Sequence, residues 1–203
     1  MKNKKKTQED KILQIIDKRK IIRPIDLKSY GISRTPIDRL LKKGKIVRIS
    51  RGLYSKPDIF EEEKISLIEV CKGVPKGVIC LLTALRFHDI GTQNPHQVWL
   101  ALDRKAMSPR IKSIKLRVVR FSGRALSFGV EEHVFYGTKI RVTDPAKTVA
   151  DCFKYRHKIG LDVAVEAIRE GWKDQKFTMD ELFRAARICR VENVIRPYAE
   201  ALV

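Results

Sequence analysis

The sequence predicts an α+β protein in two parts. The N-terminal part is helical and ends in a basic hairpin, and the C-terminal part is a mixed domain with a small, mainly antiparallel sheet and a helical end. Three observations predict this: a basic helix-and-hairpin pattern in residues 35–54, a group of strand patterns between residues 97 and 142, and helical patterns from Pro145 onward. Strands followed by a run of helices indicate α+β rather than alternating α/β architecture.

A short basic helix is predicted at the start of Thr35–Tyr54. Thr35 suits the N-cap of this helix and Pro36 suits its first position. Gly44 then provides the left-handed residue that ends it. Its apolar residues recur at helical spacing and turn the basic side chains the other way. The apolar residues are Ile37, Leu40 and Leu41, and the outward basic residues are Arg39, Lys42 and Lys43.

The flanking residues complete a winged helix-turn-helix. A two-stranded hairpin, the wing, is predicted at Lys45–Ile49 and Leu53–Ser55. Two helices and a short turn are predicted before the basic helix, at Thr7–Lys20, Pro24–Tyr30 and Gly31–Arg34. In this arrangement a recognition helix enters the major groove of DNA. The alternative is a small helical bundle whose basic residues are only a solvated face.

The charge of the chain indicates a polyanionic partner. The 203 residues carry a formal net charge of +19. Residues 1–60 hold 18 Lys and Arg against 6 Asp and Glu, a net +12, whereas residues 61–203 hold 25 against 18, a net +7. Such a field attracts DNA, and counterion release from the phosphates makes binding depend steeply on salt. We therefore expect double-stranded DNA as a partner.

The residues expected to contact DNA fall into two groups. Residues at the start of a recognition helix reach base edges, and here they are Arg34, Thr35 and Arg39. Phosphate contacts set the orientation of the protein rather than its sequence preference. They are expected from Ser33, Lys42, Lys43, Lys45, Arg48 and Arg51. With roughly six phosphate contacts, the slope of log affinity against log salt should be about −5.

A domain boundary is predicted near residue 60, between residues 1–60 and 61–203. Pro57-Asp58 ends the wing strand, and Glu61-Glu62-Glu63 changes the sign of the local charge. Strands are predicted at Gln97–Leu102, Lys115–Phe121, Glu132–Tyr136 and Lys139–Val142. Helices are predicted at Glu62–Cys71, Val78–His88, Pro145–Tyr155, Leu161–Trp172, Met179–Cys189 and Glu192–Ala201.

Several classes of protein lack support in the sequence. The Lys-rich start is not a secretory signal, and no apolar run is long enough to span a membrane. The cysteines lack CxxC spacing, so we expect free buried thiols and a reducing, cytoplasmic setting. They are Cys71, Cys80, Cys152 and Cys189. We expect no cofactor, no bound metal and no membrane partner.

Enzymatic activity is not expected either. The segment Gly73–Gly77 resembles a phosphate loop, but it has three intervening residues and no following Lys-Ser or Lys-Thr. His88 and His133 each lie beside acids, without the spacing of metal ligands. We expect His88 at a helix C-terminus, where its positive form is favoured. Asp144 is expected to cap the following helix rather than to act in catalysis.

A basic stretch in the second domain leaves two interpretations open. Arg104–Arg124 contains eight basic residues and no acid. Lys115 and Arg117 share one face of the predicted strand, and Arg120 lies on the other. The bases could be a solvated face of the sheet. They could equally form a second phosphate-contacting surface, or a docking site for nucleic acid held by a partner.

Five sequence segments occur in an order that points to a known family. They are RGLY (Arg51–Tyr54), CLLTALRFH (Cys80–His88), RFSG (Arg120–Gly123), RVTDPAKTVADCF (Arg141–Phe153) and RPY (Arg196–Tyr198). With these segments the chain resembles the AbiEi-family antitoxins of type IV toxin–antitoxin systems. The resemblance implies an N-terminal winged helix that binds the promoter of its own operon. It also implies a C-terminal antitoxin domain that opposes a co-encoded AbiEii-like nucleotidyltransferase toxin, without requiring a stable complex between the two.

The resulting hypothesis is an antitoxin that is also a transcriptional autorepressor. The main alternative is a winged-helix regulator whose second domain senses a small effector or pairs subunits. The adjacent reading frame distinguishes them, since a nucleotidyltransferase favours the antitoxin and a metabolic enzyme favours the sensor. A nuclease or nucleotide-modifying enzyme is a third hypothesis, and it predicts magnesium- or manganese-dependent activity on nucleic acid.

Overall fold

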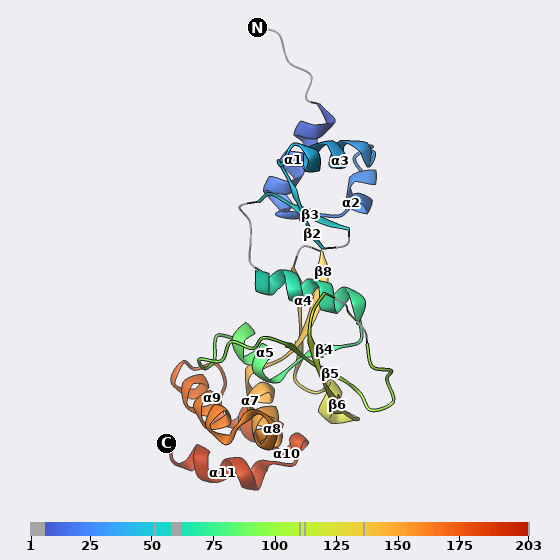
Figure 1. Cartoon of the computed structure of the whole chain (residues 1–203). Helices are drawn as coiled ribbons and strands as arrows, with labels where there is room; N and C mark the ends of the chain where they lie inside the picture. Colours follow the sequence, from blue (N-terminus) through green and yellow to red (C-terminus); the bar gives the residue numbers. More distant parts are fainter. Residues whose placement is uncertain are drawn as a thin grey trace. The chain divides into compact units, whose positions relative to one another are not determined.

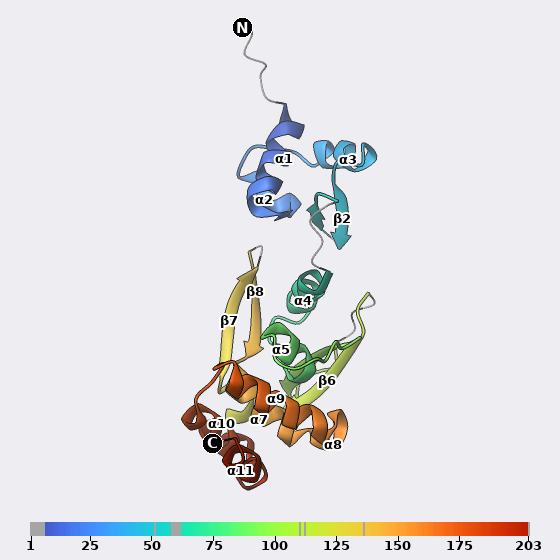
Figure 2. The same ribbon diagram turned by 90° about the vertical axis from the view of Figure 1, so that its left-hand side faces the viewer.

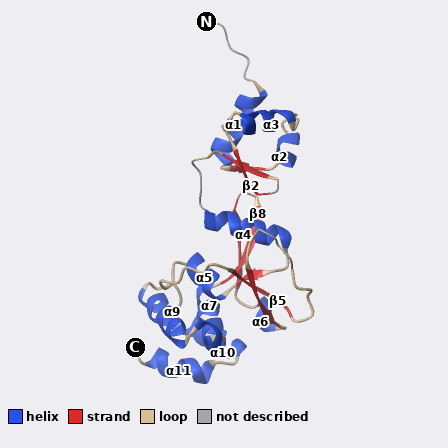
Figure 3. Cartoon of the chain, in the orientation of Figure 1, coloured by secondary structure: helices blue, strands red, loops and turns tan. Residues whose placement is uncertain are grey.

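The computed structural model describes residues 7–50, 52–57, 62–109, 111, 113–135 and 137–202. The chain divides into two compact units by its internal contacts (Figure 1). One consists of Met1–Glu69 with Phe135–Thr138, and the other of Val70–Val134 with Lys139–Val203. Each unit contains both helices and a sheet (Figure 3), which confirms the α+β prediction. The division falls inside a helix, and the domain boundary near residue 60 stays a prediction.

The N-terminal unit contains the predicted helices and wing. Its helices are α1 (Gln8–Arg19), α2 (Pro24–Lys28) and α3 (Thr35–Lys42). Its strands are β1 (Ile21–Ile22), β2 (Val47–Ser50) and β3 (Leu53–Ser55). They form an antiparallel sheet in the order β1-β3-β2. Strand β1 was not predicted, because two residues are too few to show the period of a strand.

One small core holds this unit together. Its buried side chains come from all three helices, the turn and the sheet: Ile12, Ile16, Ile22, Leu27, Ile32, Ile37, Leu40, Ile46 and Tyr54. Thr7 caps α1 in a capping box with Asp10, whose backbone N–H donates to the Thr7 hydroxyl at 3.2 Å. On α1 and α3 the apolar residues recur at spacings of three and four, so each helix has one apolar face. These two faces pack in the same core.

The ends of α3 differ from the prediction in one respect. Arg34, not Thr35, is the N-cap, and Thr35 is the first helical residue. The Arg34 carbonyl accepts from the Ile37 N–H at 3.0 Å, and Pro36 is tolerated because N–H groups in the first turn have no intrahelical partner. At the other end Gly44 has φ +64°, and the Lys45 N–H reaches the Leu40 carbonyl at 3.0 Å. The predicted left-handed glycine is thus confirmed as part of a Schellman motif.

The second unit contains a five-stranded sheet in the order β6-β5-β4-β8-β7. The strands are β4 (Val78–Ile79), β5 (Val98–Asp103), β6 (Leu116–Phe121), β7 (Val130–Phe135) and β8 (Thr138–Thr143). The sheet is mixed rather than mainly antiparallel, since β5 pairs with β6 and β4 with β8 in parallel, and β4 pairs with β5 antiparallel. The connection between β5 and β6 spans residues 104–115, which is long enough for a parallel crossover.

The predicted helix Val78–His88 is wrong in its first residues. Val78 and Ile79 form a strand that lies between β5 and β8, and only α5 (Leu81–Phe87) is helical. A central strand is buried on both faces, so its apolar residues do not alternate with polar ones. By periodicity alone, such a run cannot be distinguished from a buried helix.

The remaining helices belong to the second unit, in which α7 contacts α5, α8, α9, α10 and α11 (Figure 2). They are α6 (Arg124–Ser127), α7 (Pro145–Lys154), α8 (Arg156–Ile159), α9 (Leu161–Lys173), α10 (Met179–Cys189) and α11 (Glu192–Glu200). Helix α4 (Glu62–Gly73) precedes the sheet. The Asp144 side chain accepts from the Lys147 N–H at 2.6 Å, so the predicted cap of α7 is confirmed.

A buried ion pair lies at the centre of the second unit. The Lys147 and Asp151 side chains are 0% and 2% exposed, and Lys147 Nζ lies 2.5 Å from Asp151 Oδ2. Cys189 Sγ donates to Asp151 Oδ1 at 3.2 Å, and the ammonium lies 4.7 Å from the Phe121 ring centroid. Burial lowers the pKa of Lys147, but the attraction and hydrogen bond of Asp151 together with the nearby Cys189 and Cys80 outweigh burial, so the pKa is raised. Burial raises the pKa of Asp151.

Candidate DNA-binding surface

Helix α3 presents a basic face to solvent because its apolar face is buried. Pro36, Ile37 and Leu40 are buried against the small core of the N-terminal unit. Arg39 and Lys42 lie on the opposite side of the helix and are exposed. The prediction that this apolar seam turns the basic residues outward is therefore confirmed.

The predicted DNA contacts lie on the turn, on α3 and on the wing. Among the described residues, all members of this predicted set are exposed. They are Ser33, Arg34, Thr35, Arg39, Lys42, Lys43, Lys45 and Arg48. Arg51 lies outside the described residues. Exposure is required for contact with a duplex, but it does not establish the contact, so the assignment of these residues stays a prediction.

Lys43 has a partner that was not predicted. Its Nζ lies 2.7 Å from Glu9 Oε2, across 34 residues of sequence. The Lys43 side chain is 53% exposed, whereas that of Glu9 is 20% exposed. The carboxylate therefore partly neutralises one of the cations expected to meet a phosphate. Glu9 lies in the first turn of α1, where an acid also suits the helix dipole, and its sequence position does not identify Lys43 as the partner.

Arg48 is the predicted basic contact on strand β2 of the wing. Strands β2 and β3 pair antiparallel, with Val47 opposite Ser55 and Arg48 opposite Tyr54. The register shifts between Arg48 and Ser50, just before the turn of the hairpin. A shift of this kind bends a strand and re-aims its side chains. Arg48 thus precedes the bend at the edge of the three-stranded sheet.

Three helices closed by a small antiparallel sheet, with a basic helix held outward, define a winged helix-turn-helix, a class of DNA-binding domain. Residues 10–55 match the family described as "Transcriptional regulator, AbiEi antitoxin". This match covers α1, α2, α3 and the wing, and it confirms the resemblance to the AbiEi family. The family is one of antitoxins and transcriptional regulators, which are not typically enzymes.

Among solved structures, the chain is similar to the crystal structure of the RV2827C protein from Mycobacterium tuberculosis. The TM-score is 0.58 at 14% identity, and the likeness covers 96% of this chain and 80% of that one. At such low identity it shows a common fold and nothing about activity. No curated protein matches the chain.

The basic stretch Arg104–Arg124 contains side chains with structural roles. The Arg120 guanidinium donates to the carbonyls of Asp103 and Ala106 at 2.9 and 2.6 Å, so it holds the segment that follows β5. The Arg117 guanidinium carbon lies 5.6 Å from the Trp99 ring centroid. Arg110 and Lys112 lie outside the described residues. Arg120 is thus occupied within the fold, and both interpretations of the other bases stay open.

The candidates for other chemistry are buried or scattered. Burial lowers the pKa of His88, so the expectation that its positive form is favoured is wrong. Its Nε2 lies 2.7 Å from the Thr143 carbonyl oxygen, which suits a neutral ring that donates there. Within the described ranges no group of three or more His, Cys, Asp or Glu residues could hold a metal ion. Nor does any helix in that part of the chain have the length and apolar character to cross a membrane.

The four cysteines are free and buried, as predicted. Burial raises the pKa of the Cys71 thiol to about 11 and raises those of the other three. Cys189 is also hydrogen-bonded to Asp151. Thiols that stay protonated inside a core are poor nucleophiles and poor metal ligands. These cysteines therefore act as packing residues.

Proposed function

We propose that this protein is the antitoxin of a type IV toxin–antitoxin system and represses its own operon. The observation that supports this most directly is an exposed basic α3 within a segment that matches an antitoxin and transcriptional regulator family. In this proposal residues 1–60 bind the promoter. Residues 61–203 oppose a co-encoded nucleotidyltransferase toxin, without catalysis and without a required stable complex. Both activities take place in the cytoplasm.

Promoter recognition divides between the start of α3 and its surroundings. Arg34, Thr35 and Arg39 contact base edges, because the first turns of a recognition helix enter the groove. The other basic and polar residues contact phosphates and set the orientation. They are Ser33, Lys42, Lys43, Lys45, Arg48 and Arg51. Lys43 exchanges Glu9 for a phosphate when the protein binds DNA.

Repression and neutralisation are assigned to different units, so one substitution should separate them. Arg39 is exposed, and its replacement by Ala leaves the buried face of α3 unchanged. We expect full-length Arg39→Ala to lose repression of a reporter driven by the upstream region of its own gene. The same variant should still rescue growth of cells that express the toxin from an unrelated promoter.

This experiment tests promoter repression and toxin neutralisation separately. Retained repression by Arg39→Ala would count against recognition through α3. If the wild-type chain gave no growth rescue, the antitoxin assignment would fail, whatever the reporter showed. Arg187→Ala, an exposed substitution on α10, is the matched control for loss of one arginine, and it should retain repression.

A further inference from the structure

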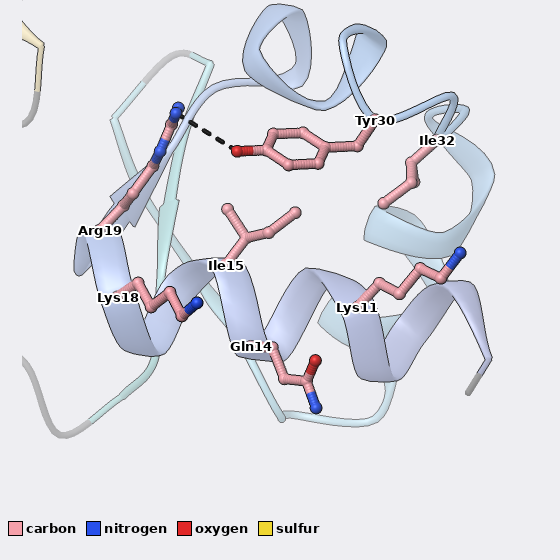
Figure 4. A pocket seen from close by; sticks show the side chains of 7 residues that line it. All are labelled: Lys11, Gln14, Ile15, Lys18, Arg19, Tyr30 and Ile32. Carbon is pink, nitrogen blue, oxygen red and sulfur yellow. Dashed lines mark hydrogen bonds between the residues drawn. The ribbon is translucent and has the colours of Figure 1, made fainter. Parts of the chain in front are cut away.

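A cavity of about 340 Å³ opens between α1 and the segment that joins α2 to α3 (Figure 4). It is lined by Lys11, Gln14, Ile15, Lys18, Arg19, Tyr30 and Ile32. All these residues belong to the N-terminal unit. Small-molecule sites have volumes of about 300–1,000 Å³, so this cavity lies at the lower end of that range.

The cations of the cavity are not neutralised by neighbouring acids. Among the described residues, no acid lines it and neither Lys11 nor Lys18 has an ion-pair partner. Three acids of this unit are paired with other cations: Asp26 with Arg23, Glu9 with Lys43 and Asp17 with Lys56. Lys18, in the last turn of α1, complements the helix dipole, but Lys11, near the other end, does not. The cavity thus carries an uncompensated positive charge.

The remaining lining is apolar and includes an aromatic ring. Ile15 and Ile32 approach the ring of Tyr30 from α1 and from the turn (Figure 4). Tyr30 is 49% exposed. Arg19 Nη2 donates to the Tyr30 hydroxyl at 3.4 Å, and the Arg19 guanidinium carbon lies 5.8 Å from the ring centroid. Arg19 therefore holds the ring while half of the residue stays open to a ligand.

We propose that this cavity binds a nucleoside monophosphate and that binding weakens the interaction with DNA. The base packs against Tyr30, Ile15 and Ile32, and the phosphate meets the ammonium groups of Lys11 and Lys18. A cavity of about 150 Å³ holds benzene, so the larger volume here accommodates a base with its sugar. The regulatory half of this inference rests on the proposed function of the N-terminal unit as a DNA-binding domain.

The cavity is connected to the recognition helix through the turn. Ile32 is 5% exposed and packs in the same core as Ile37 and Leu40 of α3. A ligand that touches Ile32 therefore contacts the segment from which α3 begins. A bound phosphate also removes positive charge from the unit that attracts DNA. By linkage, DNA must weaken nucleotide binding by the same factor as nucleotide weakens DNA binding.

Calorimetry on the full-length chain tests the site directly, with adenosine 5′-monophosphate as the probe. Adenosine supplies the base without the anion, and inorganic phosphate supplies the anion without the base. We expect the monophosphate to bind at least tenfold more tightly than either. Lys18→Ala and Tyr30→Ala should each weaken it at least fivefold. Both side chains are exposed, and unchanged circular dichroism would verify that the variants fold.

Two controls separate the cavity from the DNA-binding face. Lys28→Ala removes an exposed lysine of α2 that does not line the cavity, and Arg39→Ala removes a basic side chain of α3. Both should bind the monophosphate like the wild type. The proposal is overturned if the monophosphate does not bind. It is also overturned if Arg39→Ala abolishes binding while Lys18→Ala leaves it unchanged.

The proposed effect of the monophosphate on DNA binding is measured in a separate experiment. Saturating monophosphate should weaken binding to promoter DNA at least threefold in the wild type, and Lys18→Ala should require an at least fivefold higher monophosphate concentration for the same effect. An unchanged DNA affinity with the cavity occupied would overturn this half. If the unliganded protein bound no DNA at all while the monophosphate still bound through Lys18 and Tyr30, the proposed function would fail and the site would stand.

Discussion

At the scale of single residues, Lys43 is paired with Glu9, and in the proposed function this contact competes with DNA for the Lys43 ammonium. The two groups lie 2.7 Å apart on a partly exposed surface. Replacing Glu9 by Gln should free the ammonium and tighten DNA binding by up to about fivefold, because exposed pairs contribute about 0.2–1 kcal/mol. Fluorescence anisotropy with labelled promoter DNA measures the change. In a chain that already carries Lys43→Gln, the Glu9 substitution should give no such gain, and an equal gain there would contradict the account.

Titration of His88 should make the stability of the second unit depend on pH, and the shift of its pKa fixes the direction of this dependence. Burial lowers the pKa of His88 in the folded chain below its ordinary value of 6.5. The unfolded chain therefore binds more protons in the window between the lowered pKa and 6.5, and stability must fall as the pH drops through this window. His88→Gln keeps a donor for the Thr143 carbonyl and should flatten this part of the curve. Urea unfolding between pH 5 and 7.5 measures it, and an unchanged slope in the variant would contradict the assignment.

At the scale of elements, the features that the sequence predicts are those that depend on residues close together in the chain. The spacing of Ile37 and Leu40 predicts the buried face of α3, and Gly44 predicts its end. The parallel pairing of β5 with β6 was not predictable, because it depends on residues far apart in sequence. Lys147 and Asp151 have the i,i+4 spacing of an exposed helix pair, yet both are buried. Only the packing of α7 among its neighbours shows that this pair is a core feature.

Removing one partner of the buried Lys147–Asp151 pair on α7 should lower the unfolding free energy more than replacing both residues by apolar ones. Asp151→Ala leaves the Lys147 ammonium buried without its partner and should cost about 3–5 kcal/mol of unfolding free energy. The double substitution Lys147→Met with Asp151→Leu should cost clearly less, since it buries no charge. Both tryptophans, Trp99 and Trp172, belong to the second unit, so their fluorescence during urea unfolding reports on it. A double variant as unstable as Asp151→Ala would contradict this expectation.

At the scale of the whole molecule, the two units have different physical characters. The N-terminal unit has a small core, and its exposed basic residues lie on the turn, α3 and the wing. Residues 1–60 of this unit carry +12 of the formal net charge of +19. The second unit has the larger core, which contains three of the four buried thiols, and it also holds the buried ion pair. For the proposed DNA-contact residues that the structure describes, the sequence predicted correctly that their side chains are exposed. The Lys43 partner was not, because Glu9 precedes it by 34 residues.

A salt titration of promoter binding, with wild type and Arg39→Ala, tests the central claim most directly. The wild type should show a slope of log affinity against log salt of about −5, from roughly six phosphate contacts. Arg39→Ala should keep most of this slope and lose about 1–3 kcal/mol of preference for the promoter over an unrelated duplex. Tight binding that does not respond to salt, or an Arg39→Ala variant with unchanged preference, would contradict recognition through α3.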